Sequence, residues 1–482
     1  MDGLTYEQLL DNMKHGTSNM LILGRPGSGK SYLIRELTKF RNDMILAAPT
    51  GIAAMNINGR TLDSVFGIKP YTRTDFRHYL HESNRSLIER ANVLLVDEIS
   101  MVKFNTLDKI DRIAKRVRGN DLLFGGLRLI FIGDLMQLEP VVDEYEASII
   151  REEYPEYDKD AGFYNARSMK ENGFLRDGFE FCFLRHNFRQ DKDIAFQGLL
   201  DEIRKGKLSF RTGGIVNGRF VYEKDYYRLY LKGFHFLTVT NNKAASINRQ
   251  IIERMPGRCY VSRPEINYDM TYEKLLSKSP IDKPFMIKSG MKVMFVVNDG
   301  GANRRWANGT MGIVENVGQY NDYVDSVRIR IDRDGMSSFY DVGRIRVDTY
   351  GLSDGSKEVV GHVENFPFVP AFATTIDKVQ GMTLAKAAIV LEQKDTRPNQ
   401  VYVALSRVGS LSGLILLGRK ILPRDVSTSK KVDGFYSSIE SRIREVTYAP
   451  LTQFVNRNTI NIVVNGKNHN INFSLEPSAL SA

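Results

Sequence analysis

A glycine-rich octapeptide, residues 24–31, could bind the phosphates of a nucleotide. It follows a short apolar run, residues 20–23, and precedes a helical pattern over residues 32–40, which is the context of a P-loop. The glycines let backbone N–H groups surround the phosphates, Lys30 can reach the β- and γ-phosphates, and the Ser31 hydroxyl can ligate Mg²⁺. A chance match in a glycine-rich turn is the alternative, and the flanking strand and helix disfavour it. The predicted nucleotide-binding residues of this loop are Gly24, Pro26, Gly27, Ser28, Gly29, Lys30 and Ser31.

Three polar side chains that follow two further apolar runs could complete a hydrolytic site. Asp97 and Glu98 come directly after residues 93–96, and Gln137 follows residues 129–132. Because open α/β sheets bind ligands at the carboxyl ends of their strands, these side chains are expected near the phosphates. Asp97 can hold Mg²⁺ through its water shell, Glu98 can polarise the attacking water, and Gln137 can sense the γ-phosphate. An Asp-Glu pair alone is usually only solvated, so the upstream P-loop is what favours this function.

The elements that must position these residues form two α/β patterns. Short apolar runs that alternate with helical patterns, residues 44–48 among them, predict a parallel sheet covered on both faces. A second pattern begins near Phe179, resumes at Ala371, and contains the apolar runs 387–391 and 414–417. The sequence therefore predicts two parallel-sheet lobes.

A change of character between the two parts of the second pattern predicts an inserted β-domain. Short strands separated by turns such as Asn308-Gly309 are typical of a small barrel. A hairpin is also predicted near the end of the chain, from residues 460–464 and 471–473. The strands expected in the insertion are residues 291–297, 311–314, 326–331 and 343–347.

The composition sets broad limits on function. The chain has 482 residues and a formal net charge of +10, which suits a polyanionic partner without proving one. Cys182 and Cys259 stand far apart without a partner motif, which indicates a reducing compartment and no zinc site. No apolar run is long enough to cross a bilayer, so a cytoplasmic protein of a bacterium or a phage-infected cell is expected, with no membrane partner.

An ordered set of motifs resembles those of superfamily 1B DNA helicases of the RecD, Dda and PIF type, and is most similar to the PIF branch. The set begins with residues 4–8 and the P-loop and ends with residues 402–407, so it covers most of the chain. Its other members are residues 48–59, 61–67, 97–101, 133–141, 187–190 and 374–384.

This resemblance implies a fold and a division into domains. The expected fold is α/β, with two RecA-like parallel-sheet lobes, a small insertion in the first and an SH3-like β-barrel insertion in the second. The expected domains are lobe 1 at 1–66 and 90–178, the small insertion at 67–89, lobe 2 at 179–250 and 369–430, the β-barrel insertion at 251–368, and a C-terminal extension at 431–482.

The resemblance also implies an activity and roles for further residues. Gln8 would read adenine, Gly381 would line the nucleotide cleft, and Arg189 and Arg407 would act as arginine fingers on ATP. The expected protein is an ATP-dependent helicase on single-stranded and forked DNA in replication, recombination or repair. The resemblance favours 5′→3′ movement, and the opposite or dual polarity stays open. The alternatives are a translocase that does not separate strands and a P-loop switch that does not hydrolyse ATP. The residues expected to grip DNA are Pro49, Thr50, Ser64, Phe66, Thr374 and Lys378.

Several features leave two interpretations open. Asp63 and Asp377 stand where relatives commonly carry histidine, and each either repels DNA phosphate or caps a helix or turn. The aromatic and basic segment 71–79 is either a strand-separating pin or a surface loop. Trp306 either packs into the barrel or stacks on a base. Alternating arginines of the insertion form either a DNA-facing side or a solvated face: Arg328, Arg330, Arg344 and Arg346.

Overall fold

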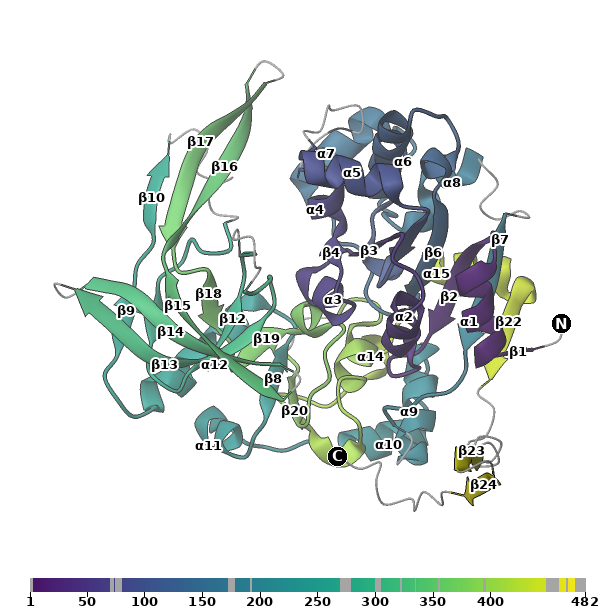
Figure 1. The fold of residues 1–482 in the computed structure, drawn as a ribbon. Coiled ribbons are helices and arrows are strands. Elements are labelled where there is room, and N and C mark those ends of the chain that lie inside the picture. Colours follow the sequence, from purple (N-terminus) through teal and green to yellow (C-terminus); the bar gives the residue numbers. More distant parts are fainter. Residues whose placement is uncertain are drawn as a thin grey trace.

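The structure is a computed structural model, and the chain forms two parallel sheets with an antiparallel β-domain beside them (Figure 1). The residues that it describes are 3–69, 73, 80–171, 178–190, 193–268, 279–299, 305–320, 323–333, 335–353, 356–392, 396–447, 459–464 and 467–472. Among these residues, no helix combines the length and the apolar character that a bilayer crossing requires.

The first sheet has eight parallel strands in the order β1-β22-β7-β2-β6-β5-β3-β4. The four apolar runs predicted for lobe 1 are all strands of this sheet, and their side chains are mostly buried, as expected for a sheet covered on both faces. The strands are β1 (Leu4–Thr5), β22 (Ile443–Thr447), β7 (Phe179–Leu184), β2 (Asn19–Gly24), β6 (Arg128–Gly133), β5 (Val93–Val96), β3 (Met44–Ala48) and β4 (Arg60–Thr61).

Two strands of this sheet differ from the sequence prediction. The run beginning at Phe179 was expected to open lobe 2, but β7 pairs with β2 in the first sheet, from Asn19 opposite Phe179 to Gly24 opposite Leu184. The strand β22 was not predicted, and it pairs with β7 on one side and β1 on the other. Lobe 1 is therefore completed by a segment that the prediction had placed in the C-terminal extension.

The second sheet has four parallel strands in the order β19-β8-β20-β21. These strands are β19 (Ala373–Thr375), β8 (His235–Thr238), β20 (Ala387–Val390) and β21 (Leu414–Leu417), and all are buried. The helices that accompany the two sheets are α1 (Tyr6–His15), α2 (Lys30–Thr38), α3 (Gly51–Asn56), α4 (Leu62–Phe66), α5 (Glu82–Arg90), α6 (Phe104–Arg118), α7 (Glu144–Glu153), α8 (Arg167–Glu171), α9 (Ile194–Arg204), α10 (Phe210–Asn217), α11 (Tyr226–Leu231), α12 (Asn241–Arg254), α14 (Gln400–Leu405) and α15 (Lys430–Ile439).

The inserted β-domain contains three sheets instead of one predicted barrel. A five-stranded antiparallel sheet has the order β15-β14-β13-β12-β18, and its pairings do not close it on itself among the described residues. The long strands β16 and β17 pair with each other and with β10 in a second sheet, and β9 pairs with β11. The strands are β9 (Tyr260–Ser262), β10 (Glu265–Tyr268), β11 (Phe285–Ile287), β12 (Lys292–Phe295), β13 (Met311–Tyr320), β14 (Tyr323–Arg333), β15 (Met336–Gly343), β16 (Ile345–Ser353), β17 (Ser356–Asn365) and β18 (Phe368–Pro370).

The structure bears on both open interpretations of the β-domain, that of Trp306 and that of the four arginines. Trp306 is buried and stacks on Phe295 with ring centroids 4.5 Å apart, so it is a core residue. Arg330 pairs with Glu315, and Arg344 donates to backbone carbonyl groups. Because Arg346 lies on β16, in a different sheet from β14, the four arginines do not share one face of one sheet.

Two smaller predictions concern the insertion of lobe 1 and the end of the chain. Within the segment expected as an insertion, α5 is a helix and Arg73 lies near Glu152 and Glu153. The rest of the segment 71–79 lies outside the described residues. The predicted terminal hairpin is confirmed as β23 (Thr459–Val464) paired antiparallel with β24 (Lys467–Asn472).

Candidate functional site: a nucleotide cavity beside a candidate nucleic-acid interface

The P-loop joins β2 to α2 in the predicted geometry. Gly27 and Gly29 adopt φ values of 83° and 87°, in the left-handed region that favours glycine. A Cβ added at Gly27 would lie 2.4 Å from the Cβ of Arg189, which belongs to the segment leading into lobe 2. The loop therefore needs glycine both for its backbone turn and for the close approach of the other lobe.

Lys30 occupies the centre of this loop. Its side chain is buried, and Nζ donates to the carbonyl groups of Gly24 at 2.7 Å and Arg25 at 2.8 Å. Burial lowers the pKa of Lys30, while the nearby carboxylates of Asp134, Glu98 and Asp97 raise it. An ammonium surrounded by carbonyl and carboxylate oxygens is a site that a phosphate can enter.

Asp97 and Glu98 lie at the carboxyl end of β5, as predicted. Both are buried, and Oδ1 of Asp97 accepts a hydrogen bond from the backbone N–H of Glu98 at 2.9 Å. Burial, followed by the charge of Glu98, raises the pKa of Asp97. Glu98 itself has a φ of 51°, a conformation that costs a non-glycine residue roughly 1–2 kcal/mol. This backbone turn directs the two adjacent carboxylates into one cavity.

Gln137 is fixed at the same edge of the sheet. Its side chain is 2% exposed, and its Oε1 has no hydrogen-bond partner among the residues that the structure describes. Its carbonyl group accepts from Nδ2 of Asn399, in lobe 2, at 3.3 Å. A buried amide without a partner for its oxygen is costly unless a ligand or water completes it.

The next cluster, which the sequence did not reveal, ties the two lobes together beside the P-loop. Asp134 is fully buried and accepts from Arg204 at 2.9 Å and from the Tyr402 hydroxyl at 3.1 Å. Burial raises the pKa of Asp134, but Arg204 and Lys30 more than offset this and hold the pKa below its usual value. Arg204 ends α9 and Tyr402 lies on α14, so no local pattern brings them to Asp134.

The two predicted arginine fingers come from lobe 2 and lie near each other. Nη1 of Arg189 donates to the carbonyl group of Ser406 at 2.9 Å. The Arg407 guanidinium is 1% exposed and is supported by carbonyl groups of Val403, Val379 and Met382. Burial, then the charge of Arg189, lowers the pKa of Arg407 to about 10, so Arg407 remains cationic at neutral pH.

These groups line one cavity of about 1170 Å³, which we call the P-loop cavity. Its donor set fits a triphosphate with Mg²⁺: a lysine and two arginines for phosphate oxygens, and the oxygens of Ser31 and Asp97 for the metal. Gly24 and Ser28 pack against each other in the loop and are not in the lining. The predicted residues that line the cavity are Pro26, Gly27, Gly29, Lys30, Ser31, Asp97, Glu98, Gln137, Arg189, Gly381 and Arg407.

Gln8 is not among the residues that line the P-loop cavity. Its Oε1 accepts from the backbone N–H of Thr5 at 2.9 Å, which closes a capping box at the start of α1. Tyr6 and Tyr32 line the cavity instead, with ring centroids 6.2 Å apart. The structure thus places two aromatic rings, which sequence reasoning did not select, where a base could stack.

A second cavity, of about 640 Å³, lies on the other side of α3 and is named here the α4 cavity. Pro49, Thr50 and Ser64 line it from lobe 1, and Lys378 lines it from lobe 2. Thr50 caps α3 and Ser64 accepts from Arg60, so both hydroxyl groups are held in place. Four of the six predicted DNA-gripping residues therefore meet around one cavity.

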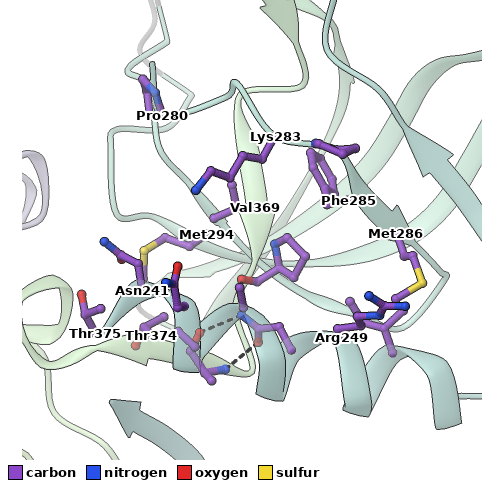
Figure 2. A pocket seen from close by; sticks show the side chains of 18 of the residues that line it. Asn241, Arg249, Pro280, Lys283, Phe285, Met286, Met294, Val369, Thr374 and Thr375 are labelled. Atoms are coloured by element: carbon purple, nitrogen blue, oxygen red, sulfur yellow. Dashed lines mark hydrogen bonds between the residues drawn. The ribbon is translucent and has the colours of Figure 1, made fainter. Parts of the chain in front are cut away.

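A third cavity, of about 600 Å³, lies beside α12 and is named here the α12 cavity (Figure 2). Thr374 lines it, and its hydroxyl group contacts Nε2 of His235 at 2.8 Å. Lys378 and Met294 line both this cavity and the α4 cavity, so the two adjoin. Asn241 and Lys283, which sequence reasoning did not select, lie around the same space (Figure 2).

Phe66 does not face either cavity, so its predicted role in gripping DNA is wrong. Its side chain has 0% exposure and belongs to the main hydrophobic core. Phe66 is the last residue of α4, and a large aromatic ring there is better buried than solvated.

The two aspartates that depart from the resemblance both line the α4 cavity but differ in their partners. Asp377 is paired with Arg397 and accepts from Gln400 at 3.5 Å, so its charge is compensated within lobe 2. Asp63 lies in the first turn of α4 and lines the α4 cavity. It keeps contact with solvent, but the surrounding protein desolvates it and raises its pKa, against the charges of Lys103 and Lys109.

Comparisons with known proteins show which proteins are similar to this chain in sequence. The model of the PIF1-like helicase family matches residues 5–153. An ATP-dependent DNA helicase Pif1 from Bdellovibrio bacteriovorus is 30% identical over 446 residues, covering 89% of this chain and 90% of that protein. This chain belongs to the Pif1 helicase family.

Solved Pif1 structures share the fold. The Pif1 helicase from Bacteroides in complex with ADP-AlF3 and single-stranded DNA has a TM-score of 0.75 and 28% identity, covering 90% of this chain and 96% of that chain. A structure described as DNA unwinding at forked double-stranded DNA by two coordinating Pif1 helicases has a TM-score of 0.74 and 27% identity, with the same coverage. The expected RecA-like lobes are confirmed by this likeness, whereas the SH3-like character of the insertion stays a prediction.

Proposed function

We propose that this Pif1-family chain is an ATP-dependent DNA helicase that moves along single-stranded DNA and opens duplex at a fork. One observation carries the proposal: Lys30 from lobe 1 and Arg189 and Arg407 from lobe 2 line a single cavity. Its relatives are named ATP-dependent DNA helicases, and solved relatives are described with single-stranded and forked DNA.

The residues of the P-loop cavity support hydrolysis of ATP. Phosphoryl transfer depends on positioning and on neutralising charge, which Lys30 and the two arginines supply. Ser31 and Asp97 would hold Mg²⁺, which neutralises charge on the β- and γ-phosphate oxygens. Glu98 orients and deprotonates the attacking water, and the amide of Gln137 reads the γ-phosphate. The free oxygen of the Gln137 amide is available for this water.

The division of these groups between lobes supports a motor. ATP that bridges Lys30 and the arginines stabilises closure of the lobes, and hydrolysis removes that stabilisation. The α4 cavity draws residues from both lobes and from the β-domain, and the adjoining α12 cavity draws residues from lobe 2 and the β-domain, so a strand bound across them contacts parts that move. Repeated closure then displaces one set of contacts along the strand relative to the other. Pro49, Thr50 and Ser64 serve as contacts on lobe 1, and Thr374 and Lys378 on lobe 2.

The remaining assignments belong to the same proposal. We infer 5′→3′ movement from the family resemblance, with other or dual polarity as the outcome to be tested. Work in replication, recombination or repair, with partner proteins from those processes, suits a helicase of this class. Both cysteines are free thiols, which suits the reducing cytoplasm of a bacterial or phage-infected cell.

One experiment separates this proposal from its alternatives. ATP turnover is measured with and without single-stranded DNA, and unwinding is measured on duplexes that carry either a 5′ or a 3′ tail. We expect DNA to stimulate turnover several-fold, 5′-tailed duplex to be unwound, and Lys30→Ala to abolish both. Stimulated turnover without unwinding would identify a translocase, and nucleotide binding without turnover would identify a switch.

A further inference from the structure

Two short segments, one from each lobe, border both the P-loop cavity and the α4 cavity. In lobe 1, Thr50, Gly51 and Ile52 at the start of α3 line the α4 cavity, while Ala53 and Asn56 of the same helix line the P-loop cavity. A ligand in either cavity therefore contacts an element that also borders the other.

The second segment runs from Asp377 to Thr383 in lobe 2 and has the same property. Lys378 and Gln380 line the α4 cavity, whereas Gly381 and Thr383 line the P-loop cavity. Gly381 adopts a φ of 81°, so the chain turns sharply just after Gln380. Two adjacent residues, Gln380 and Gly381, therefore border different cavities.

Gln380 makes a contact that crosses this boundary. Its Nε2 donates to Oε2 of Glu98 at 3.4 Å, although the Gln380 side chain lines the α4 cavity. The side chain is 5% exposed, and its Oε1 has no hydrogen-bond partner among the described residues. One amide is therefore in contact with the proposed catalytic carboxylate while bordering the proposed DNA site.

The length of this hydrogen bond indicates that it can be exchanged. A distance of 3.4 Å is near the upper limit for an N–H···O bond, where the interaction is weak. A phosphodiester oxygen in the α4 cavity is a strong charge-assisted acceptor for the same N–H group. A strand in that cavity competes with Glu98 for the amide, and the exchange needs only rotation of the glutamine side chain.

We propose that Gln380 is a positioning residue that couples DNA binding to ATP hydrolysis. Without DNA, the amide donates to Glu98 and keeps one of its carboxylate oxygens from the attacking water. With single-stranded DNA in the α4 cavity, the amide donates to the phosphodiester and Glu98 becomes free to accept from water. This inference rests on the proposed function and adds the residue through which DNA stimulates turnover.

The test removes the amide without shortening the side chain. Gln380→Met keeps the length and lacks any donor, so we expect DNA-free kcat to rise about twofold to fivefold, the range from a weak to an ordinary hydrogen bond. The KM for ATP is expected to stay unchanged, because Gln380 does not line the P-loop cavity. Stimulation by a saturating oligonucleotide then falls toward one.

Two further variants make the test decisive. Gln380→Asn keeps the amide on a side chain one methylene shorter, which cannot span the contact with Glu98, so it is expected to behave as the methionine variant does. The matched control is Gln400→Met, an equally buried glutamine of lobe 2 that contacts Asp377 and not Glu98. We expect it to retain the wild-type stimulation ratio, and thermal unfolding of all three variants reports their folding.

The outcomes separate this inference from the function on which it rests. If DNA does not stimulate the wild-type protein, the proposed function fails and the coupling fails with it. If the wild-type protein is stimulated but folded Gln380 variants keep the wild-type ratio, or lose turnover in both conditions, the coupling role alone is overturned.

Discussion

The P-loop cavity and the two cavities on the opposite side of α3 differ in what lines them. The P-loop cavity concentrates charged groups, with Lys30, Arg189 and Arg407 facing Asp97 and Glu98 across one volume. The α4 and α12 cavities are lined mainly by hydroxyl, amide and apolar groups, and their charged groups are more dispersed. Lys378 borders both cavities, Asp63, Lys69 and Asp377 border the α4 cavity, and Arg249, Asp282 and Lys283 border the α12 cavity. This difference indicates that the P-loop cavity selects its ligand by charges at fixed positions, whereas the α4 and α12 cavities accept a polymer whose groups vary along its length.

This contrast follows from the ligands themselves. A triphosphate presents several charges within a few ångströms, so each counter-charge must be placed accurately. Single-stranded DNA presents one charge per nucleotide and bases of different shape, so tolerant contacts suffice. Substitutions on the two sides should therefore differ in the size of their effects. Three measurements test this, and a fourth tests the ion pair that joins the lobes.

The largest effect is expected at Arg189. Arg189→Ala should lower kcat about a thousandfold, the range typical of arginine fingers, with little change in nucleotide affinity. Steady-state ATP turnover and binding of a labelled nucleotide measure the two quantities. Arg185→Ala is the matched control, because Arg185 is exposed, pairs with Glu445 and lies four residues away. A fall of less than tenfold at Arg189 would show that charge at this point is not essential.

A decrease in stability is expected when the buried ion pair between Arg204 and Asp134 is broken. Arg204→Met leaves the fully buried Asp134 without its cationic partner, so the free energy of unfolding should fall by about 3–5 kcal/mol. Urea unfolding followed by circular dichroism measures this change. Asp134→Leu combined with Arg204→Met should recover part of the loss, because no unpaired charge remains. If the double variant is less stable than the single one, the cost does not come from an uncompensated carboxylate.

A smaller effect is expected at Lys378. Lys378→Ala should weaken binding of single-stranded DNA about tenfold and make the logarithmic salt dependence shallower by about 0.7, the value for one phosphate contact on a single strand. Fluorescence anisotropy titrations at several salt concentrations provide both numbers. Lys386→Ala is the control, since Lys386 is exposed in lobe 2 and lies outside the lining of both cavities. An unchanged salt slope would remove Lys378 from the DNA contacts.

The smallest effect is expected at Asp63. Asp63→Asn removes a negative charge from the α4 cavity, so single-stranded DNA should bind about threefold more tightly, in keeping with one partly solvated charge. The pKa of Asp63 is raised, so lowering the pH neutralises the wild-type carboxyl group earlier than usual, and the advantage of the variant should shrink as the pH falls. Titrations at neutral and mildly acidic pH check this. A variant that binds more weakly at neutral pH would show that Asp63 acts as a structural acceptor.

The parts of the site that were predictable from the sequence are those built by local chain geometry. The P-loop and Asp97-Glu98 each follow a buried strand directly, and Gln137 follows one after a short turn, so the order of strands placed them at one edge. Phe66 was misjudged because a motif next to a binding segment does not specify which side chains of a one-turn helix face inward. The role of Gln8 stays a prediction, because the same glutamine that could read a base also completes a local helix cap.

Long-range pairings were beyond the reach of the sequence pattern. The strand β22 carries polar residues on a short segment and pairs with β7, more than 250 positions earlier, as the contact of Arg185 with Glu445 shows at a separation of 260. Likewise, Arg204 and Tyr402 reach Asp134 only because two helices of lobe 2 pack beside lobe 1. Such partners depend on tertiary packing, which a linear pattern does not encode.

The return of the chain to the first sheet has a mechanical consequence. After lobe 2, α15 packs on lobe 1, where Phe435 stacks on Tyr164, and β22 then joins β7. Two separate covalent spans therefore connect the lobes, one after β7 and one before α15. A body tethered at two points swings about the line between them and cannot slide freely along it. If hydrolysis separates the lobes as proposed, this double connection favours rotation about one axis, so that successive strokes follow the same path.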